Sequence, residues 1–137
     1  FLFQGQLWTS LTLTIGLTTL LWGAFSALRQ TDLKALLAYS TISQLGLILS
    51  LYGLSTPLGN FAATVHLVNH AAFKATLFFV TGMIDHATGT RDVRLLSGLR
   101  HAMPVSFVLA IVAALAMAGV PPLGGFISKE LFFETML

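Results

Sequence analysis

The sequence predicts an all-α fold, a polytopic transmembrane helical bundle of about five helices, and three observations lead to this prediction. Of the 137 residues, 55% are hydrophobic and only 9% are charged, against about 25% charged in an average soluble domain. The mean hydropathy is +0.85. The apolar residues form long runs without the apolar–polar alternation of membrane strands, and backbone groups in lipid need partners within their own segment, which favours helices.

Five apolar segments are the expected helices of one transmembrane domain that covers 1–137; they lie at 7–28, 35–54, 61–84, 102–120 and 126–137. About 20 apolar residues cross a bilayer, so we expect the first four to span it, while the fifth is shorter. Gly53 and Pro57 separate the second and third segments, and a Gly- and Pro-rich stretch follows the fourth. Because the chain lacks an initial Met and stops inside an apolar segment, we expect an internal fragment of a longer protein.

Basic residues gather on one side of the expected bundle. If the helices alternate in direction, loops 29–34 and 85–101 share one side, and loops 55–60 and 121–125 share the other with the lead-in at 1–6. The first side holds Arg29, Lys34, Arg91, Arg94 and Arg100, five of the seven basic residues, and the second side holds none. This is the positive-inside pattern, so loops 29–34 and 85–101 are expected to be cytoplasmic.

Lys74 is a charged residue near the middle of the third apolar segment, about 20 Å from its start. A lysine at the centre of a membrane helix costs about 2.5–3.5 kcal/mol on insertion scales and usually serves a function. Neither surface is easily reached from there, which argues against a lysine that extends to the interface. We therefore expect Lys74 to bind and release a proton.

His66 and His70 precede Lys74 at eight and four residues, a spacing that places all three on one helical face. Histidine changes protonation near neutral pH, so the row is interpreted as a proton relay with waters between its members. His-x-x-x-His also fits two metal ligands, but no Glu follows His66 and no third ligand is obvious. Hydrogen bonding between helices by the histidines and Asn69 is a further alternative.

Lys129 and Glu130 follow the Pro/Gly interruption, in a position where transporters build discontinuous helices around an ion site. Lys129 is a candidate proton-transfer residue together with its neighbour Glu130, although the two point to different helix faces. Glu134 shares a face with Glu130. An ordinary interfacial helix start, with a lysine that extends to the surface, is the alternative.

Several polar residues are expected to have accessory roles. The second segment carries Tyr39, Ser40, Thr41, Ser43 and Gln44, which can bond to neighbouring helices or line a hydrated path, with packing the expected role for each alone. Asp32 and Lys34 begin that segment, where Asp32 can cap the helix. Loop 88–92 is expected to be an exposed turn.

The sequence also excludes several classes of function. With no Cys, there are no disulfides, thiolate zinc sites or cysteine nucleophiles. No phosphate loop, haem motif or hydrolytic triad occurs, so we expect no cofactor, no metal and no enzyme of its own. The pI near 9.4 does not indicate nucleic acid binding, because no basic cluster with interleaved aromatic residues is present.

Three long strings resemble the antiporter-like subunits of respiratory complex I and its relatives. These are QTDLKALLAYSTISQLG at 30–46, HLVNHAAFKATLF at 66–78 and MAGVPPLGGFISKE at 117–130. The string IDHATGTRDVR at 84–94 is similar to the large subunit of Mrp-type multisubunit Na+/H+ antiporters, and also to the related subunit of membrane-bound hydrogenases. Together the strings cover nearly the whole chain.

The resemblance implies two inverted five-helix repeats, each with a discontinuous helix and a half-channel, of which this chain holds the last helix of the first and most of the second. It implies that Lys74 is the central lysine of a hydrophilic axis, that His66 and His70 are its water-linked neighbours, and that Lys129 is the lysine of the discontinuous helix. The expected function is proton and cation translocation within a hetero-oligomeric Na+/H+ antiporter, with lipid and other membrane subunits as partners, in a bacterial plasma (inner) membrane. The alternatives are a proton-pumping subunit of a redox-driven complex and a non-conducting scaffold.

Overall fold

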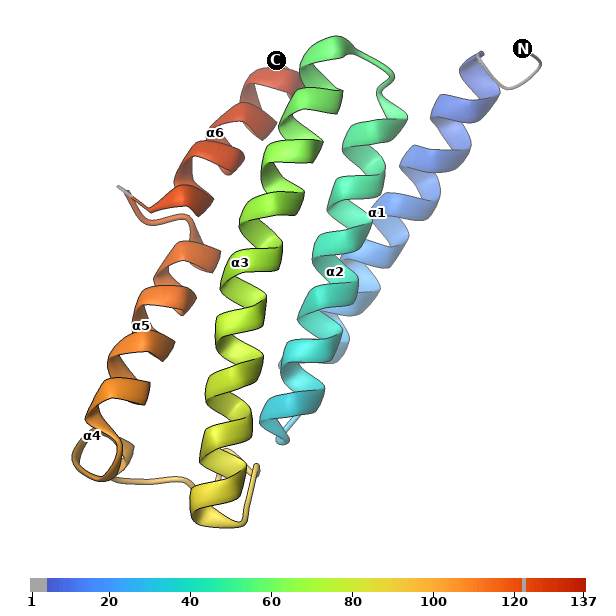
Figure 1. The fold of residues 1–137 in the computed structure, drawn as a ribbon. Helices are drawn as coiled ribbons and strands as arrows, with labels where there is room; N and C mark the ends of the chain where they lie inside the picture. Colours follow the sequence, from blue (N-terminus) through green and yellow to red (C-terminus); the bar gives the residue numbers. More distant parts are fainter. Residues whose placement is uncertain (1–4, 122) are drawn as a thin grey trace.

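Helices make up most of the protein in the computed structural model, which describes residues 5–121 and 123–137. They are α1 (Gln6–Leu28), α2 (Leu33–Gly53), α3 (Pro57–Thr88), α4 (Leu99–Ala102), α5 (Pro104–Ala118) and α6 (Gly124–Met136). Figure 1 shows α1, α2 and α3 side by side in chain order, with α5 and α6 end to end beyond α3. Within the described ranges, extended pairing is limited to an isolated bridge between Asp32 and Asp92. The all-α prediction is confirmed.

Three helices, α1, α2 and α3, are long and apolar enough to cross a membrane. The observed α1 and α2 agree with the expected segments to within two residues. The third helix, expected at 61–84, is longer and runs Pro57–Thr88. It starts early because Thr56 caps it, its Oγ1 accepting from the Gly59 amide at 3.0 Å, and because proline fits the first turn. It ends at Gly89, whose positive φ of 70° is the left-handed conformation that closes many helices.

Glycine allows α1 and α2 to lie in backbone contact. A Cβ placed on Gly46 would lie 2.6 Å from the Gly16 carbonyl oxygen, and one placed on Gly16 would lie 2.7 Å from the Gly46 carbonyl oxygen. Small residues that let helix backbones approach are typical of membrane interfaces, where apolar side chains gain little by leaving lipid. The pair is further joined by Ser43, which donates to the Leu20 carbonyl at 2.9 Å.

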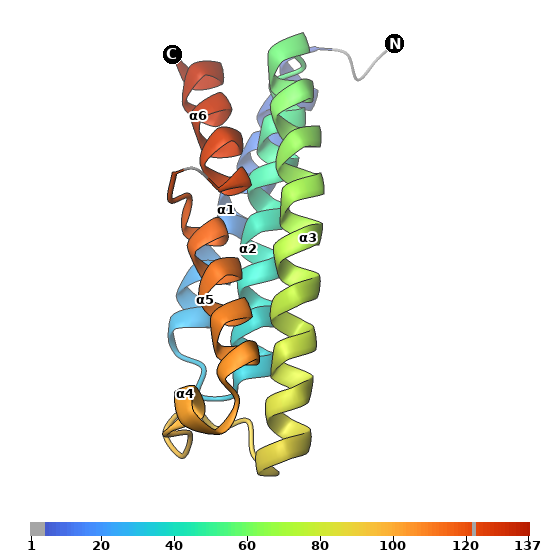
Figure 2. The same ribbon diagram turned by 60° about the vertical axis from the view of Figure 1, so that its left-hand side comes forward.

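The fourth apolar segment does not form the full span expected at 102–120. Its helix α5 has 15 residues, or about 22 Å at the α-helical rise, against a hydrocarbon core of about 30 Å. The helix stops because Gly119 takes a left-handed φ of 82°. Then α6 continues in the same general direction, so the two form one discontinuous element along α3 (Figure 2).

The break between α5 and α6 therefore lies part-way along the bundle and not at its far surface, where loop 121–125 was expected (Figure 1). The discontinuous last helix is present, but as a pair of half-helices that replaces the expected fourth and fifth segments. Pro122 and the lead-in at 1–4 lie outside the described residues.

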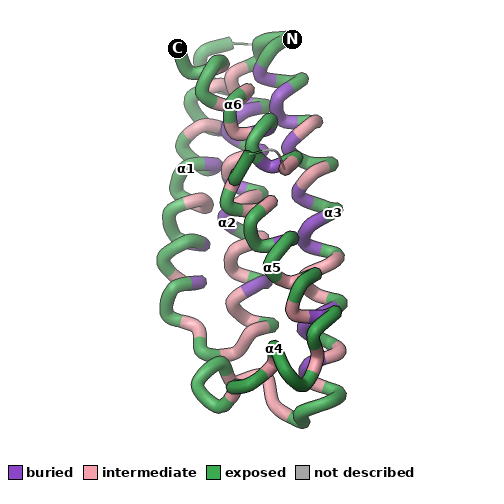
Figure 3. Tube along the Cα trace, turned by 90° about the vertical axis from the view of Figure 1, so that its left-hand side faces the viewer, coloured by how far each residue is buried: buried purple, intermediate pink, exposed green. Residues whose placement is uncertain are grey.

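Apolar side chains cover much of the outer surface. Leu7, Leu21 and Trp22 on α1 are each at least two-thirds exposed, and Figure 3 shows an almost continuous exposed face on that helix. The buried positions lie mainly where α2 and α3 face their neighbours. This distribution is that of a membrane bundle, whose outside is apolar and whose polar groups lie between helices.

Candidate functional site

The buried face of α3 carries a row of three titratable residues. His66, His70 and Lys74 are 2%, 5% and 4% exposed, respectively, and Lys74 lies close to the midpoint of the helix. The ring centroids of the two histidines are 6.4 Å apart, as the four-residue spacing predicts. The three residues therefore share one helical face, as predicted. The proton relay along this face stays a prediction.

Lys74 points at the first half of α2. Its Nζ donates to the Leu37 carbonyl oxygen at 3.1 Å and to the Ser40 hydroxyl. Among the described residues the ion pairs all lie at the end of the bundle where α1 ends, α2 begins and α3 ends, which we call the loop end. The contacts of the Lys74 ammonium group are therefore with neutral oxygens. A lysine that no carboxylate holds can exchange its proton more readily than one in an ion pair.

The two histidines differ in their hydrogen bonding. His66 has a partner at each ring nitrogen: Ser128 Oγ lies 3.0 Å from Nδ1 and Gln44 Oε1 lies 2.8 Å from Nε2. His70 packs edge-on against Phe73, with ring centroids 5.5 Å apart, and its Nδ1 has no partner in the described part of the chain. A buried polar atom of this kind normally binds an ordered water.

Lys129 lies at the break between the half-helices. Its Nζ donates to the Ala118 carbonyl oxygen at 2.9 Å, which satisfies one of the free carbonyls at the end of α5 and places a cation at the negative end of the helix dipole. A cavity of about 200 Å³ connects it with the histidine row. The lining residues are His66, Ser128 and Lys129, with Leu47, Leu51, Phe132 and Phe133.

The remaining predicted residues lie outside this row. Asn69 Nδ2 donates to the Gly124 carbonyl at 2.9 Å and so holds the start of α6. Ser43 bonds α1 instead of the row, while Glu130 and Lys34 are exposed. Asp32 caps α2, accepting from the amides of Lys34 and Ala35 at 2.8 and 3.3 Å, as expected.

Sequence reasoning did not single out the partners of the row. Ser40 and Gln44 were expected mainly to pack, yet they contact Lys74 and His66, and Ser128 was not considered. A partial signal was available, because Ser40 and Gln44 are four residues apart and therefore lie on one face of α2.

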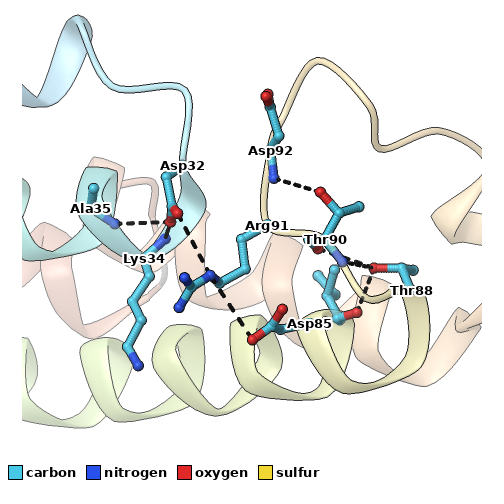
Figure 4. Close-up of polar contacts among 9 residues, drawn as sticks. Asp32, Lys34, Ala35, Asp85, Thr88, Thr90, Arg91 and Asp92 are labelled. Carbon is cyan, nitrogen blue, oxygen red and sulfur yellow. Dashed lines mark hydrogen bonds and ion pairs between the residues drawn. The ribbon is translucent and has the colours of Figure 1, made fainter.

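A second polar cluster lies at the loop end of the bundle, and we call it the ionic clasp (Asp32, Asp85, Arg91). Arg91 Nε lies 3.6 Å from Asp32 Oδ2 and 3.9 Å from Asp85 Oδ2, so one guanidinium joins the start of α2 to the end of α3 (Figure 4). Backbone bonds reinforce the clasp, because Leu33 N donates to Arg91 O at 2.9 Å and Val93 N to Thr31 O at 2.8 Å.

A helical bundle with a discontinuous element and a buried row of His and Lys has the features of an ion-translocating membrane domain. The chain belongs to the family described as "NADH:quinone oxidoreductase/Mrp antiporter, TM", whose model matches residues 1–137. This confirms the resemblance seen in the sequence, and the chain is part of an integral membrane protein.

Individual relatives carry names of transporter subunits. The chain is 47% identical to a Na(+)/H(+) antiporter subunit of Bacillus subtilis, covering 100% of this chain and 18% of the relative. It is 63% identical to a probable K(+)/H(+) antiporter subunit of Rhizobium meliloti, covering 86% and 12%, respectively. The chain thus spans less than a fifth of the length of these curated relatives.

A solved structure supports the same assignment. The structure of the Mrp complex from Dietzia sp. DQ12-45-1b contains a chain that matches with a TM-score of 0.92 and 46% identity, covering 99% of this chain and 15% of that one. The likeness therefore extends over the whole arrangement of helices, including the discontinuous element.

Proposed function

We propose that this chain forms part of the conducting core of a multisubunit cation/proton antiporter, in which protons move along Lys74, His70, His66 and Lys129. One observation carries the proposal. His66, His70 and Lys74 follow one another along the buried face of α3, and the cavity that His66 shares with Lys129 links this row to the helix break. A buried row of titratable groups has a high desolvation cost and is seldom kept without a function.

The contacts along the row suit proton exchange. Lys74 is surrounded by neutral oxygens, His70 has an open nitrogen for a water, and the cavity between His66 and Lys129 has room for several waters at about 30 Å³ each. Lys129 completes the path at the helix break, where backbone groups are freed from the helical pattern.

The proposed cation is Na+, because the relatives from Bacillus subtilis and Staphylococcus haemolyticus are named for Na(+)/H(+) antiport. The relative from Rhizobium meliloti is named for K(+)/H(+) antiport, which makes K+ the alternative. Vesicle assays run with either salt distinguish the two. Other membrane subunits are proposed as partners, since the Dietzia chain belongs to a complex.

The proposed orientation places the loop end of the bundle in the cytoplasm of a bacterial inner membrane. Support comes from Arg29, Lys34, Arg91, Arg94 and Arg100, which all lie at or near that end. The chain has no Cys, so a Ser97→Cys variant in an otherwise Cys-free complex can be labelled selectively. Labelling by an impermeant reagent from outside intact cells would contradict this orientation.

The test replaces the two lysines separately in the complete antiporter. We expect Lys74→Ala and Lys129→Ala each to abolish cation-driven pH changes in everted membrane vesicles, because either change removes a proton-binding group from the row. Arg100→Ala is the control, since Arg100 is an exposed cation away from the row. Assembly is followed by the size of the purified complex.

Unchanged transport in both lysine variants would overturn the proposed path. If both assembled variants transport normally, the non-conducting scaffold becomes the better description of this part of the protein. The redox-driven alternative is tested by the same purification, because iron–sulfur or flavin subunits that accompany the chain would favour it.

A further inference from the structure

His66 is distinguished within the row by having an uncharged, two-way partner at each ring nitrogen. Ser128 on α6 faces Nδ1 at 3.0 Å and Gln44 on α2 faces Nε2 at 2.8 Å. A hydroxyl group can donate or accept, and an amide offers an oxygen and an NH₂. Both side chains can therefore remain bonded to His66 whether the imidazole is neutral or charged.

The contacts restrict which hydrogen atoms lie where. With the Gln44 oxygen facing it, Nε2 carries a hydrogen. Neutral His66 then accepts from the Ser128 hydroxyl at Nδ1, whereas the imidazolium form donates from Nδ1 to Ser128 Oγ. Ser128 has a second acceptor for its hydrogen in the Gly125 carbonyl oxygen, at 3.0 Å. The single hydroxyl hydrogen thus has two destinations, and the charge of His66 decides between them.

We propose that Ser128 passes protons between the cavity and His66, and that its hydroxyl group turns from His66 to the Gly125 carbonyl when His66 becomes charged. The inference rests on the proposed function, since it assigns a role within the same proton path. Ser128 is 1% exposed and lines the cavity of about 200 Å³ beside Lys129, so it borders both the space where waters fit and the ring nitrogen.

The step balances as a relay. A hydronium ion in the cavity gives a proton to Ser128 Oγ while the original hydroxyl hydrogen moves to His66 Nδ1. One O–H bond forms at Ser128 as another breaks, one N–H bond forms at His66, and the hydronium ion becomes water. Ser128 is neutral before and after, His66 gains one positive charge, and the new hydroxyl hydrogen bonds to Gly125.

Among the described groups that face His66, none is a carboxylate, so hydrogen bonds stabilise its charged form. Lys129 on α6 lines the same cavity, and His70 on α3 lies 6.4 Å away between ring centroids. On α2 the facing group is the uncharged Gln44, and α5 carries no titratable residue. Since no carboxylate faces the ring from the described residues, the acceptor oxygen of Ser128 is what stabilises the Nδ1 hydrogen of the charged form.

A change in the charge of His66 would alter the hydrogen bonding in the first turn of α6. Gly125 is so close to α5 that a Cβ there would overlap the Ala116 carbonyl oxygen, and the adjoining Gly124 carbonyl is held by Asn69. The hydrogen bond from Ser128 to the Gly125 carbonyl therefore lies at the junction of the two half-helices. Ser128 directly precedes Lys129 in the sequence.

The experiment compares Ser128→Ala with Ser50→Ala in the complete antiporter. Ser50 is the matched control, because it is also fully buried and its hydroxyl donates only to a carbonyl one turn back, that of Leu47 at 2.7 Å. We expect Ser128→Ala to shift the pH profile of vesicle transport toward acid by about one pH unit, the effect of losing one hydrogen bond to a charged group. Ser50→Ala should leave the profile in place.

His66→Ala separates the two proposals. If His66→Ala abolishes transport but Ser128→Ala has the pH profile of Ser50→Ala, the role of Ser128 is overturned and the proton path stands. If His66→Ala transports normally in the assembled complex, both are overturned. Ser128→Thr keeps the hydroxyl group, and restoration of the wild-type profile supports the relay; where the added methyl prevents assembly, the comparison of the two alanine variants decides.

Discussion

The buried row and the ionic clasp place basic side chains in opposite surroundings. In the clasp, Arg91 lies between two carboxylates, and each of these side chains is more than a third exposed. In the row, Lys74 is almost fully buried and contacts a carbonyl and a hydroxyl oxygen. Water screens the exposed ions, so each ion pair of the clasp contributes little stability. Its role is to join the start of α2 to the end of α3. Neutral partners in the interior leave a lysine able to lose its proton.

The largest effect is expected from giving the row the carboxylate that the clasp has. Ser40→Asp places an anion beside Lys74 Nζ, because the Ser40 hydroxyl already contacts it. An opposite charge at this range stabilises the ammonium form, so the proton is held and transport at neutral pH should fall at least about tenfold. Ion flux in vesicles measures the loss.

Ser40→Asn is the matched control for shape without charge. Its transport rate should exceed that of Ser40→Asp by most of the roughly tenfold loss expected from the charge. Equal activity of the two variants would mean that charge at this position does not matter, and that the absence of a carboxylate near Lys74 among the described residues has no functional meaning.

A smaller effect is expected from opening the clasp. Arg91→Gln removes both exposed ion pairs, each worth about 0–1 kcal/mol, while the backbone bonds of Leu33 and Val93 remain. Amide hydrogen exchange in segment 89–98 should therefore become faster by about fivefold or less for each ion pair lost, with transport retained. Arg91→Lys keeps the charge, so its exchange rate should lie between those of the wild type and Arg91→Gln. If Arg91→Gln lost as much transport as Ser40→Asp, the proposed difference between the clasp and the row would be contradicted.

The smallest effect is expected at the Arg94–Asp92 ion pair beside the clasp. Hydrogen bonds from the Arg94 side chain, with Nη2 at 2.9 Å from Oδ2, hold the pKa of the Asp92 carboxyl group below its usual value. A lowered folded-state pKa stabilises the fold above the unfolded pKa of about 3.9, and that contribution is lost as the pH falls through the folded pKa.

Wild type and Asp92→Asn should consequently differ slightly in melting temperature at pH 7 and converge below about pH 4. Arg94→Gln should reproduce the same behaviour because it removes the other half of the pair. A difference that persists unchanged into acid would assign the effect to something other than the Asp92 charge.

The sequence predicted the first three helices well because their signal is local. Length and hydropathy locate α1, α2 and α3, and the four-residue spacing places His66, His70 and Lys74 on one face. The fourth segment was wrong as a full span, because apolar composition continues across Gly119 while the backbone conformation there ends the helix. Composition reports where a segment can lie in a membrane, and backbone conformation decides where its helix stops.

The partners of the row could not be predicted in the same way. Ser128 is 62 residues from His66, and Gln44 is 22 residues away, so no local pattern links them. The clasp is similar, since Asp32 and Arg91 meet only because α2 begins where the loop after α3 returns (Figure 4). The accessory roles also divided: Asn69 holds α6, while Ser43 bonds α1.

What the sequence determined by itself is a membrane bundle with basic loops at one end and two lysines inside, because hydrophobicity and charge act residue by residue. Tertiary structure decided that neutral oxygens face Lys74, that Ser128 and Gln44 bracket His66, and that Lys129 caps a half-helix. Those facts depend on which helix faces which, a choice made by glycine contacts and helix breaks that bring distant residues together.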